Sequence, residues 1–227
     1  TNDLNKSELE INIEKASNDT YLKSENLKSS IQNNQSLLNS FIKYDTFTDD
    51  MDFSIEVASY EDLTKKKNSD KYQFILPSFK ISKILSSDFI KYGSLIYSGS
   101  GVSQKRSTNI TENYLINDFD YNSETLFSKK GFVNNLNISY KNTSKEGRNS
   151  TTYSEDFENR NFISTNYTVK LPLQKEGLNF NSNLFPKLSL RYSPFDNQNI
   201  SSLDRQINST NVFSNNRLGL TESLESG

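Results

Sequence analysis

Cysteine and histidine are both absent from this 227-residue chain. Without cysteine the chain has no disulfide framework, no thiol nucleophile and no thiolate metal site. Without histidine it lacks the commonest general base and the commonest ligand of transition metals. No G-x-S-x-G elbow, P-loop, H-E-x-x-H helix or dinucleotide fingerprint occurs in the sequence either. We therefore expect a protein that is not an enzyme, with no catalytic, cofactor-binding or metal-binding residues.

A large excess of charge of one sign is also missing. The chain carries 26 Lys and Arg against 28 Asp and Glu, which gives a net charge of -2. Electrostatic binding of nucleic acid requires a basic excess or a basic patch. The one basic cluster, TKKKNSD at 64–70, is typical of a solvated loop. No nucleic-acid partner is expected.

Long apolar runs are absent as well. No segment reaches the roughly 18 consecutive apolar residues that a membrane-spanning helix needs. The first ten residues, TNDLNKSELE, contain no apolar core of a signal peptide. If the protein is exported or bound to a membrane, we expect its targeting signal to lie outside this chain.

The residues that are present give two conflicting signals. The hydrophobic fraction is 33% and the mean hydropathy is -0.74, values that are typical of disordered chains. Aromatic residues nevertheless make up 12% of the chain, with 15 Phe and 12 Tyr, and disordered chains are usually poor in aromatics. A β-barrel with a hydrated interior resolves the conflict, because each strand needs only one apolar side.

Alternation with a period of two residues is the dominant pattern along the chain. It is clearest in three segments, MDFSIEVASY, GFVNNLNISYK and FISTNYTVKLPL, and each is typical of a half-buried strand. The predicted apolar sides are Met51, Phe53, Ile55 and Val57; Phe132, Leu136, Ile138 and Tyr140, joined by Asn134; and Ile163, Thr165, Tyr167, Val169 and Leu171. The opposite sides are Asp52, Ser54 and Glu56; Val133, Asn135, Asn137 and Ser139; and Ser164, Asn166, Thr168 and Lys170.

Weaker alternation brings the expected total to about eleven strands. The further segments are 7–15, 35–45, 72–82, 93–104, 112–126, 187–195 and 216–226, with a less certain one at 25–32. Many approach the roughly 9–11 residues that a tilted strand needs to cross a bilayer. The sequence predicts an all-β fold, an incomplete antiparallel up-and-down transmembrane β-barrel. Residues 1–227 would form part of one barrel domain without an internal boundary.

The predicted connections alternate between long polar loops and shorter links. The long loops are 61–71, 105–111, 142–159 and 196–215, and the links are 83–92, 127–130 and 173–186. This alternation is typical of a barrel with its large loops on one side of a membrane. A secreted β-sandwich or β-solenoid adhesin is the alternative fold, and its dry interior would bury Phe132, Ile138, Tyr167 and Val169.

Proline and glycine are scarce and their positions are informative. We expect Pro77, Pro172, Pro186 and Pro194 at the ends or margins of strands, where a missing ladder N–H is tolerated. Gly93, Gly99 and Gly101 fall in a single predicted strand. Such a strand is expected to bend, to bulge or to approach another backbone closely.

Two groups of carboxylates are the only candidates for chemistry. They are Asp49, Asp50 and Asp52 in TDDMD, and Glu155, Asp156 and Glu158 in YSEDFE. A Ca²⁺ site or a glycosidase-like acid and base could use such groups. Neither group has the glycine-punctuated spacing of a Ca²⁺ loop, so solvated loop charge is the preferred interpretation.

The C-terminal third carries a distinctive order of motifs. A strand of the form P-x-L-x-L-x-Y-x-P precedes a long polar segment, an Asn-Val-Phe triplet, an arginine and an E-x-G ending. The matching residues are Pro186, Leu188, Leu190, Tyr192, Pro194, Asn211, Val212, Phe213, Arg217, Glu225 and Gly227. In this order the segment resembles the barrel domain of the lipopolysaccharide-assembly proteins, the LptD family of Gram-negative outer membranes. FILPSFKISKIL with YGSLIYSGSG resembles an earlier hairpin of that family, and NDTYLK at 18–23 resembles a turn nearer the start of the barrel.

The resemblance implies a function as well as a fold. It implies an outer-membrane translocon barrel that assembles lipopolysaccharide into the outer leaflet. The implied partners are lipopolysaccharide, a lipoprotein plug subunit similar to LptE, a periplasmic bridge that delivers lipopolysaccharide, and the lipid bilayer. Another outer-membrane barrel, of porin or receptor type, would share the alternation but not the C-terminal match.

The chain departs from the family in several places. The Asp-Arg pairing near the family's final segment reads LGLTES here, so no role of that acidic residue is carried over. The periplasmic jellyroll domain, the strands of the lateral opening and the family's cysteines are not recognisable, so we expect an internal piece of a longer protein. The assignment of faces does not identify which inward residues contact lipopolysaccharide, and the substrate-binding residues are left unassigned.

Overall fold

The computed structural model describes residues 5–16, 18, 36–66, 69–85, 92–177 and 180–194. Within these ranges the protein is all-β and contains no helix. The strands are β1 (Lys6–Asn12), β2 (Leu37–Phe47), β3 (Met51–Asp62), β4 (Tyr72–Leu85), β5 (Gly93–Arg106), β6 (Thr111–Ser123), β7 (Leu126–Phe127), β8 (Val133–Arg148), β9 (Glu158–Lys170), β10 (Leu173–Gly177), β11 (Phe180–Leu184) and β12 (Lys187–Tyr192).

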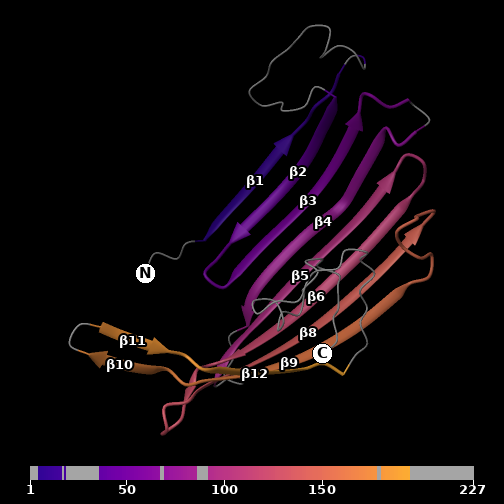
Figure 1. The fold of residues 1–227 in the computed structure, drawn as a ribbon. Helices are drawn as coiled ribbons and strands as arrows, with labels where there is room; N and C mark the ends of the chain where they lie inside the picture. The colour runs from indigo at the N-terminus through magenta and orange to yellow at the C-terminus, as the bar shows by residue number, and fades with distance from the viewer. Residues whose placement is uncertain are drawn as a thin grey trace. The chain divides into compact units, whose positions relative to one another are not determined.

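Ten of these strands form one antiparallel sheet. Its order is β1-β2-β3-β4-β5-β6-β8-β9-β12, and the short β7 pairs with β8 (Figure 1). Strands β10 and β11 form a separate two-stranded hairpin between β9 and β12. Most neighbours in the sheet are also neighbours in the sequence, which is the up-and-down order that the sequence predicts. Within the described residues the sheet is not closed.

The strand predictions are largely confirmed. The three segments with the clearest alternation fall in β3, β8 and β9. Two of the predicted connections are wrong. Residues 142–148 continue β8 instead of opening a loop, and most of the 173–186 link is the hairpin of β10 and β11. The predicted strands at 25–32 and 216–226 and the loop at 196–215 lie outside the described residues.

The prolines follow the prediction with one exception. Pro172, Pro186 and Pro194 lie at strand margins, whereas Pro77 lies inside β4. The β3–β4 register shifts between Glu56 and Ala58, at the level of Pro77. At such an irregularity the ladder is already interrupted, so a residue without an N–H is tolerated there.

The described chain groups into two compact units. Unit 1 comprises Thr1–Lys83, Ser98–Asn117 and Thr143–Arg160, and unit 2 comprises Ile84–Tyr97, Asp118–Asn142 and Asn161–Gly227. The limits fall within strands, for example between Tyr97 and Ser98 of β5.

In unit 1 the register of β1 to β4 sorts side chains onto two faces. Ile42 of β2 lies opposite Ile11 of β1 and Val57 of β3, and these three side chains are 54%, 57% and 43% exposed. One residue further along, Lys43 lies opposite Glu10 and Glu56. Successive side chains of a strand point to opposite faces. The apolar face of unit 1 therefore carries Leu9, Ile11, Ile42, Tyr44, Phe53, Ile55, Val57, Phe79 and Ile81, and its polar face carries Glu8, Glu10, Lys43, Asp45, Ser54, Glu56 and Lys80.

Large apolar side chains are mostly exposed rather than packed in a core. The buried apolar residues in the described ranges are Leu38, Ala58, Leu63, Ile116 and Phe162. Of the four residues that the adhesin alternative would bury, Phe132, Ile138 and Tyr167 are 38%, 36% and 41% exposed, and Val169 is half-buried. A soluble domain usually buries such residues.

Candidate functional site

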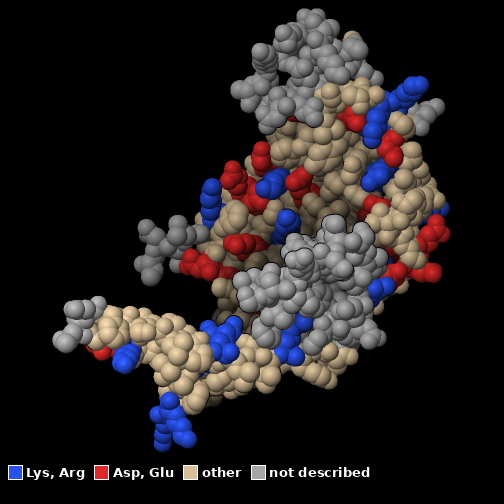
Figure 2. Space-filling view, viewed as in Figure 1, with Lys and Arg blue, Asp and Glu red and all other residues tan. Residues whose placement is uncertain are grey.

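The polar face of unit 1 begins with a row of charges across three strands. Lys43 of β2 lies between Glu10 of β1 and Glu56 of β3, and its Nζ is 2.8 Å from Asp45 Oδ2. In Figure 2 acidic and basic side chains are interspersed over β1 to β3. Opposite charges on neighbouring strands stabilise the pairing of a sheet. Because the charges alternate in sign, this part of the face is hydrated without a strong field of one sign.

A second polar network of unit 1 is centred on Glu112, at the start of β6. Gln73 Nε2 donates to Gln104 Oε1 at 3.1 Å, and Gln104 Nε2 in turn donates to Glu112 Oε2. Ser150 Oγ donates to the other Glu112 oxygen at 2.5 Å. Glu112 is buried, and a buried carboxylate requires such donors. The network joins β4, β5 and β6 to the loop that follows β8.

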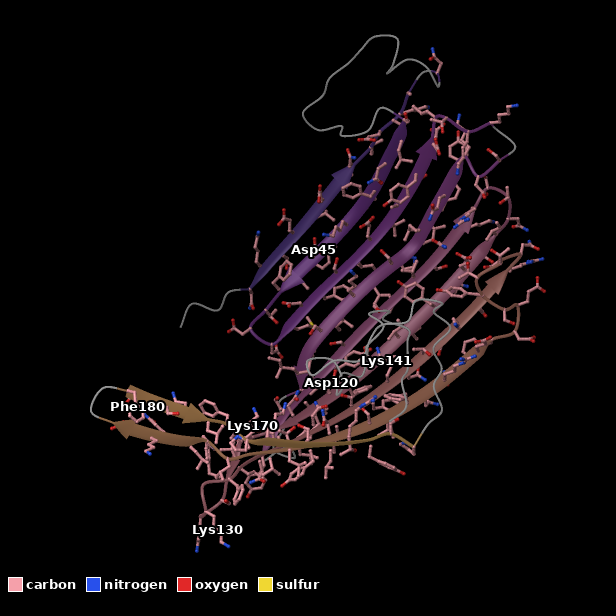
Figure 3. All side chains as sticks on the ribbon, in the orientation of Figure 1. Asp45, Asp120, Lys130, Lys141, Lys170 and Phe180 are labelled. Atoms are coloured by element: carbon pink, nitrogen blue, oxygen red, sulfur yellow. The ribbon has the colours of Figure 1, made fainter. Side chains whose placement is uncertain are left out.

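Unit 2 has a polar face of its own, which carries a ladder of hydrogen bonds between β6 and β8. Asp120 and Lys141 of this ladder are labelled in Figure 3. Lys141 Nζ donates to Asp118 Oδ2 at 3.0 Å, and Ser139 Oγ donates to Asp120 Oδ1 at 2.5 Å. Asn137 Nδ2 completes the ladder with a bond of 2.8 Å to Asn122. The second oxygen of Asp118, Oδ1, is buried and has no hydrogen-bond partner within the described residues.

Basic residues gather where β9 and β12 meet the β10–β11 hairpin. Lys170 and Lys187 are directly opposite each other in the register, and both are exposed. The next two pairs on this face are Thr168 with Ser189, whose hydroxyl oxygens are 3.1 Å apart, and Asn166 with Arg191. Like charges directly opposite each other destabilise a sheet. An anionic ligand at this end of the polar face would relieve the repulsion.

The apolar face of unit 2 carries a row of aromatic rings. The centroids of Tyr97 and Phe119 are 4.9 Å apart, and those of Phe119 and Tyr140 are 6.1 Å apart. The row crosses β5, β6 and β8. The Tyr140 hydroxyl donates to Asn161 Oδ1 on β9 at 2.7 Å, so the polar end of this ring is satisfied.

The two carboxylate groups identified in the sequence do not form a shared site. Asp49 and Asp50 lie in the turn between β2 and β3, where the Thr48 hydroxyl donates to Asp50 at 2.9 Å. Glu158 pairs with Arg160 at 3.2 Å, while Glu155 and Asp156 are exposed in the loop before β9. In the part of the chain that the structure describes, no three Asp or Glu residues are arranged to hold a metal ion. No described segment is a helix able to cross a membrane.

Comparison with protein-family models and with curated proteins finds no match to this chain. The resemblance to the LptD family therefore rests on the residues quoted for it. The first of its motifs, from Pro186 to Pro194, forms β12 and its flanks. The two segments that resemble a hairpin lie in β4 and β5, which are neighbours in the sheet. The motifs at 211–227 and most of 18–23 lie outside the described residues.

Three polar loops meet at one end of unit 1. Ser107 Oγ, in the β5–β6 turn, donates to the backbone oxygen of Ser69 at 2.7 Å. Asn149 Nδ2, after β8, donates to the backbone oxygen of Asn109 at 3.1 Å. Asn109 and Asn149 have φ angles of 66° and 54°, a region that Asn tolerates better than most residues. The loops that follow β3, β5 and β8 thus lie together.

The paired polar residues could not be identified from the sequence. Alternation predicts Asn137 and Ser139 on the polar face but does not pair them with Asn122 and Asp120. The alternation of a strand indicates which face of the sheet each side chain occupies, whereas its partner on the next strand depends on the register between the two strands. The only available signal was the repeated Asp and Asn at even positions of β6, opposite Asn, Ser and Lys at odd positions of β8.

Asp70, in the loop before β4, gives this loop cluster a pH dependence. The Thr108 hydroxyl donates to the Asp70 carboxylate, and with help from the Thr108 N–H, Arg106 and Lys65 it lowers the pKa of Asp70. The bonds to the Asp70 carboxylate therefore contribute fully to stability above the ordinary aspartate pKa of ~3.9. This contribution is lost as the pH falls through the lower pKa that Asp70 has in the folded protein. We expect the amide of Thr108 to lose protection from hydrogen exchange below about pH 4. The Thr108→Val variant should show weak protection at every pH, and a wild-type profile unchanged down to pH 2 would contradict the assignment.

Proposed function

We propose that this chain forms part of the wall of an outer-membrane β-barrel, with its apolar face toward lipid and its polar face toward a water-filled lumen. The observation that carries the proposal is the sorting of side chains in the middle of β2 and β3. There the exposed Ile42 and Val57 share one face, and Lys43 and Glu56 share the other. Exposed apolar side chains on one face and charges on the other are what a transmembrane strand requires.

The strand lengths support a membrane location. The main strands β2 to β6, β8 and β9 have 11, 12, 14, 14, 13, 16 and 13 residues. A tilted strand needs roughly 9–11 residues to cross the hydrocarbon layer. The aromatic row of Tyr97, Phe119 and Tyr140 adds apolar surface inside the strands of this face. In lipid every strand edge must be paired, so β1 and β12 would pair with strands outside the described sheet.

The substrate that we propose is lipopolysaccharide, which the barrel would deliver to the outer leaflet. Two features of the polar face support this choice. The ladder of Asp118, Asp120 and Asn122 offers acceptors for sugar hydroxyls, and the pair of Lys170 and Lys187 offers cations for phosphate groups. The motif around β12 supports it through the resemblance to the LptD family. A lipoprotein plug subunit and a periplasmic bridge would be the protein partners.

The membrane orientation can be tested with single cysteines, because the chain has none of its own. Ile42→Cys and Val57→Cys should resist a membrane-impermeant maleimide in lipid vesicles, whereas Ser54→Cys and Glu56→Cys should be labelled. All four should react after the vesicles are dissolved in denaturant. Equal labelling of the two faces in vesicles would exclude the proposed orientation.

The transport role needs a separate experiment in cells. Depletion of the protein is expected to reduce the amount of lipopolysaccharide that a surface probe detects, without a matching change in the uptake of small solutes. A porin would give the opposite pattern, with reduced solute uptake and unchanged surface lipopolysaccharide.

A further inference from the structure

The β10–β11 hairpin of unit 2 extends the β9–β12 pair beyond the main sheet (Figure 1). Leu173 lies opposite Leu184, three residues beyond the pair of Lys170 and Lys187 on both strands. Between these pairs the backbone N–H of Leu171 donates to the opposite strand at 3.0 Å. Neither strand gains an extra residue, so alternation carries the apolar side of β9 onto Leu173.

The hairpin has one apolar face and one polar face. The apolar face carries Leu173, Lys175, Phe180, Ser182 and Leu184, and the polar face carries Gln174, Glu176, Asn181 and Asn183. Every described residue of β10 and β11 is exposed. A two-stranded hairpin alone is at best marginally stable in water. Its apolar face therefore favours a partner surface.

Three exposed lysines lie on the apolar side of the hairpin or beside its base. Lys175 is on the apolar face itself, and Lys129 and Lys130 occupy the turn between β7 and β8. This turn lies beside the hairpin, because a Cβ atom at Gly131 would be 3.9 Å from the Leu171 side chain. We call Lys129, Lys130 and Lys175 the outer lysines. Within the described residues they form no ion pair.

The other charges at this end of unit 2 leave the outer lysines unneutralised. Lys170 and Lys187 add two cations on the polar face of β9 and β12, and in Figure 2 basic side chains predominate around the hairpin. The acidic residues described at 124–132 and 170–187 are Glu124 and Glu176. Glu176 is on the polar face of the hairpin, where Gln174 Nε2 donates to it at 3.2 Å. The apolar face thus combines apolar side chains with positive charge.

We propose that the apolar face of the hairpin lies in the bilayer interface and that the outer lysines bind the phosphates of anionic phospholipids there. The hairpin connects strands at the end with the shorter links, which faces the periplasm in a barrel of this kind. It therefore meets the inner leaflet, on the side of the membrane away from the lipopolysaccharide. The inference rests on the proposed function, because it requires the strands to cross a bilayer. It goes beyond that function because it assigns a lipid contact to a segment outside the membrane-spanning strands.

Charge complementarity selects the lipid class. An interfacial segment binds through its buried apolar area and through attraction between its cations and anionic lipids. Each lysine close to an anionic membrane surface raises affinity about fivefold. Phosphatidylglycerol is anionic and phosphatidylethanolamine has no net charge, so one lysine contact gives phosphatidylglycerol about a fivefold advantage.

The test uses tryptophan as a reporter, because the chain contains no Trp. Phe180→Trp places one on the apolar face of the hairpin, Asn183→Trp places one on its polar face, and Ile42→Trp places one on the apolar face of β2. Each full-length variant is reconstituted in vesicles of equal amounts of phosphatidylethanolamine and phosphatidylglycerol, in which one of the two lipids carries brominated acyl chains. Quenching of the tryptophan then reports which lipid lies against it.

Charge variants are combined with Phe180→Trp. Replacement of all three outer lysines by Gln removes their charge, and replacement by Arg retains it. As a control, Lys170→Gln with Lys187→Gln removes charge from the polar face of β9 and β12 instead.

At position 180 we expect about a fivefold preference for brominated phosphatidylglycerol. The Gln replacements of the outer lysines should abolish this preference, whereas their Arg replacements and the Lys170→Gln, Lys187→Gln control should retain it. Position 183 should not be quenched.

Equal quenching by the two lipids at position 180 would overturn the binding of anionic lipid. Absence of quenching at position 180, with normal quenching at position 42, would also overturn the proposal, would favour a protein as the partner of the hairpin, and would leave the barrel intact. Absence of quenching at both positions would show that the apolar face of β2 is not in the bilayer either, and both proposals would fail.

Discussion

Replacement of Ile42 by arginine is expected to lower the free energy of unfolding in lipid vesicles by about 2–4 kcal/mol. Ile42 occupies the centre of β2, and its side chain is 54% exposed on the apolar face. A charged side chain in the middle of a lipid-facing strand either loses its hydration or brings water into the bilayer, and both cost free energy. In a water-soluble protein the same exposed substitution would change stability by only about 0.5 kcal/mol.

The matched control is Ser54→Arg, on the polar face of β3. Ser54 lies between Asp45 of β2 and Lys80 of β4 in the register, so an arginine there gains one neighbour of opposite charge and one of like charge, and the two effects largely offset each other. We expect the control to change the free energy of unfolding by less than about 0.5 kcal/mol. Urea unfolding of both variants in vesicles measures the difference. A loss below 1 kcal/mol for Ile42→Arg would show that the apolar face does not contact the hydrocarbon layer.

The strands and their faces could be predicted from the sequence because the signal is local. From Met51 to Val57 every second residue is apolar, and the extended β-strand is the regular structure that places every second residue on the same face. The adjacency of successive strands is expected because strands that follow each other in the sequence usually pair. The all-β antiparallel sheet was therefore accessible without coordinates.

The remaining features depend on which residues lie opposite each other. Lys141 and Asp118 are 23 residues apart, and no pattern within β6 or β8 alone specifies their pairing. The β10–β11 hairpin pairs Gln174 with Asn183 and Lys175 with Ser182, a composition typical of a loop. Pro77 was misplaced for the same reason, because the register shift beside it belongs to β3 as much as to β4.

The glycines of β5 were recognised in the sequence, but the residues that they contact were not. The sequence places three glycines in one strand and predicts a close approach, which is confirmed at Gly93 and Gly101. It does not reveal that Phe79 approaches Gly101 from β4. That contact joins two strands, and only the sheet order and register bring the two residues together.

Gly93→Val is expected to destabilise the protein by about 3 kcal/mol, the upper part of the range for overpacked sites. A Cβ atom at position 93 would clash with the backbone oxygen of Asn122 and would lie 2.7 Å from the Tyr121 ring. The backbone of β6 cannot rotate away as a side chain can, so β5 and β6 would have to separate. The separation would also break the hydrogen bond of 3.1 Å from the Tyr121 hydroxyl to the backbone oxygen of Tyr92.

Ser94→Val is the matched control, because it adds the same side chain one residue later on the opposite, exposed side of β5. Valine favours strands, so the free energy of unfolding should change by less than about 0.5 kcal/mol. Urea unfolding in vesicles, followed by circular dichroism, compares the two variants. Equal stability would mean that the strand ends of β5 and β6 are not in close contact. A lower free energy of unfolding for Gly93→Val alone would show that β5 and β6 approach each other closely at position 93, where only glycine fits.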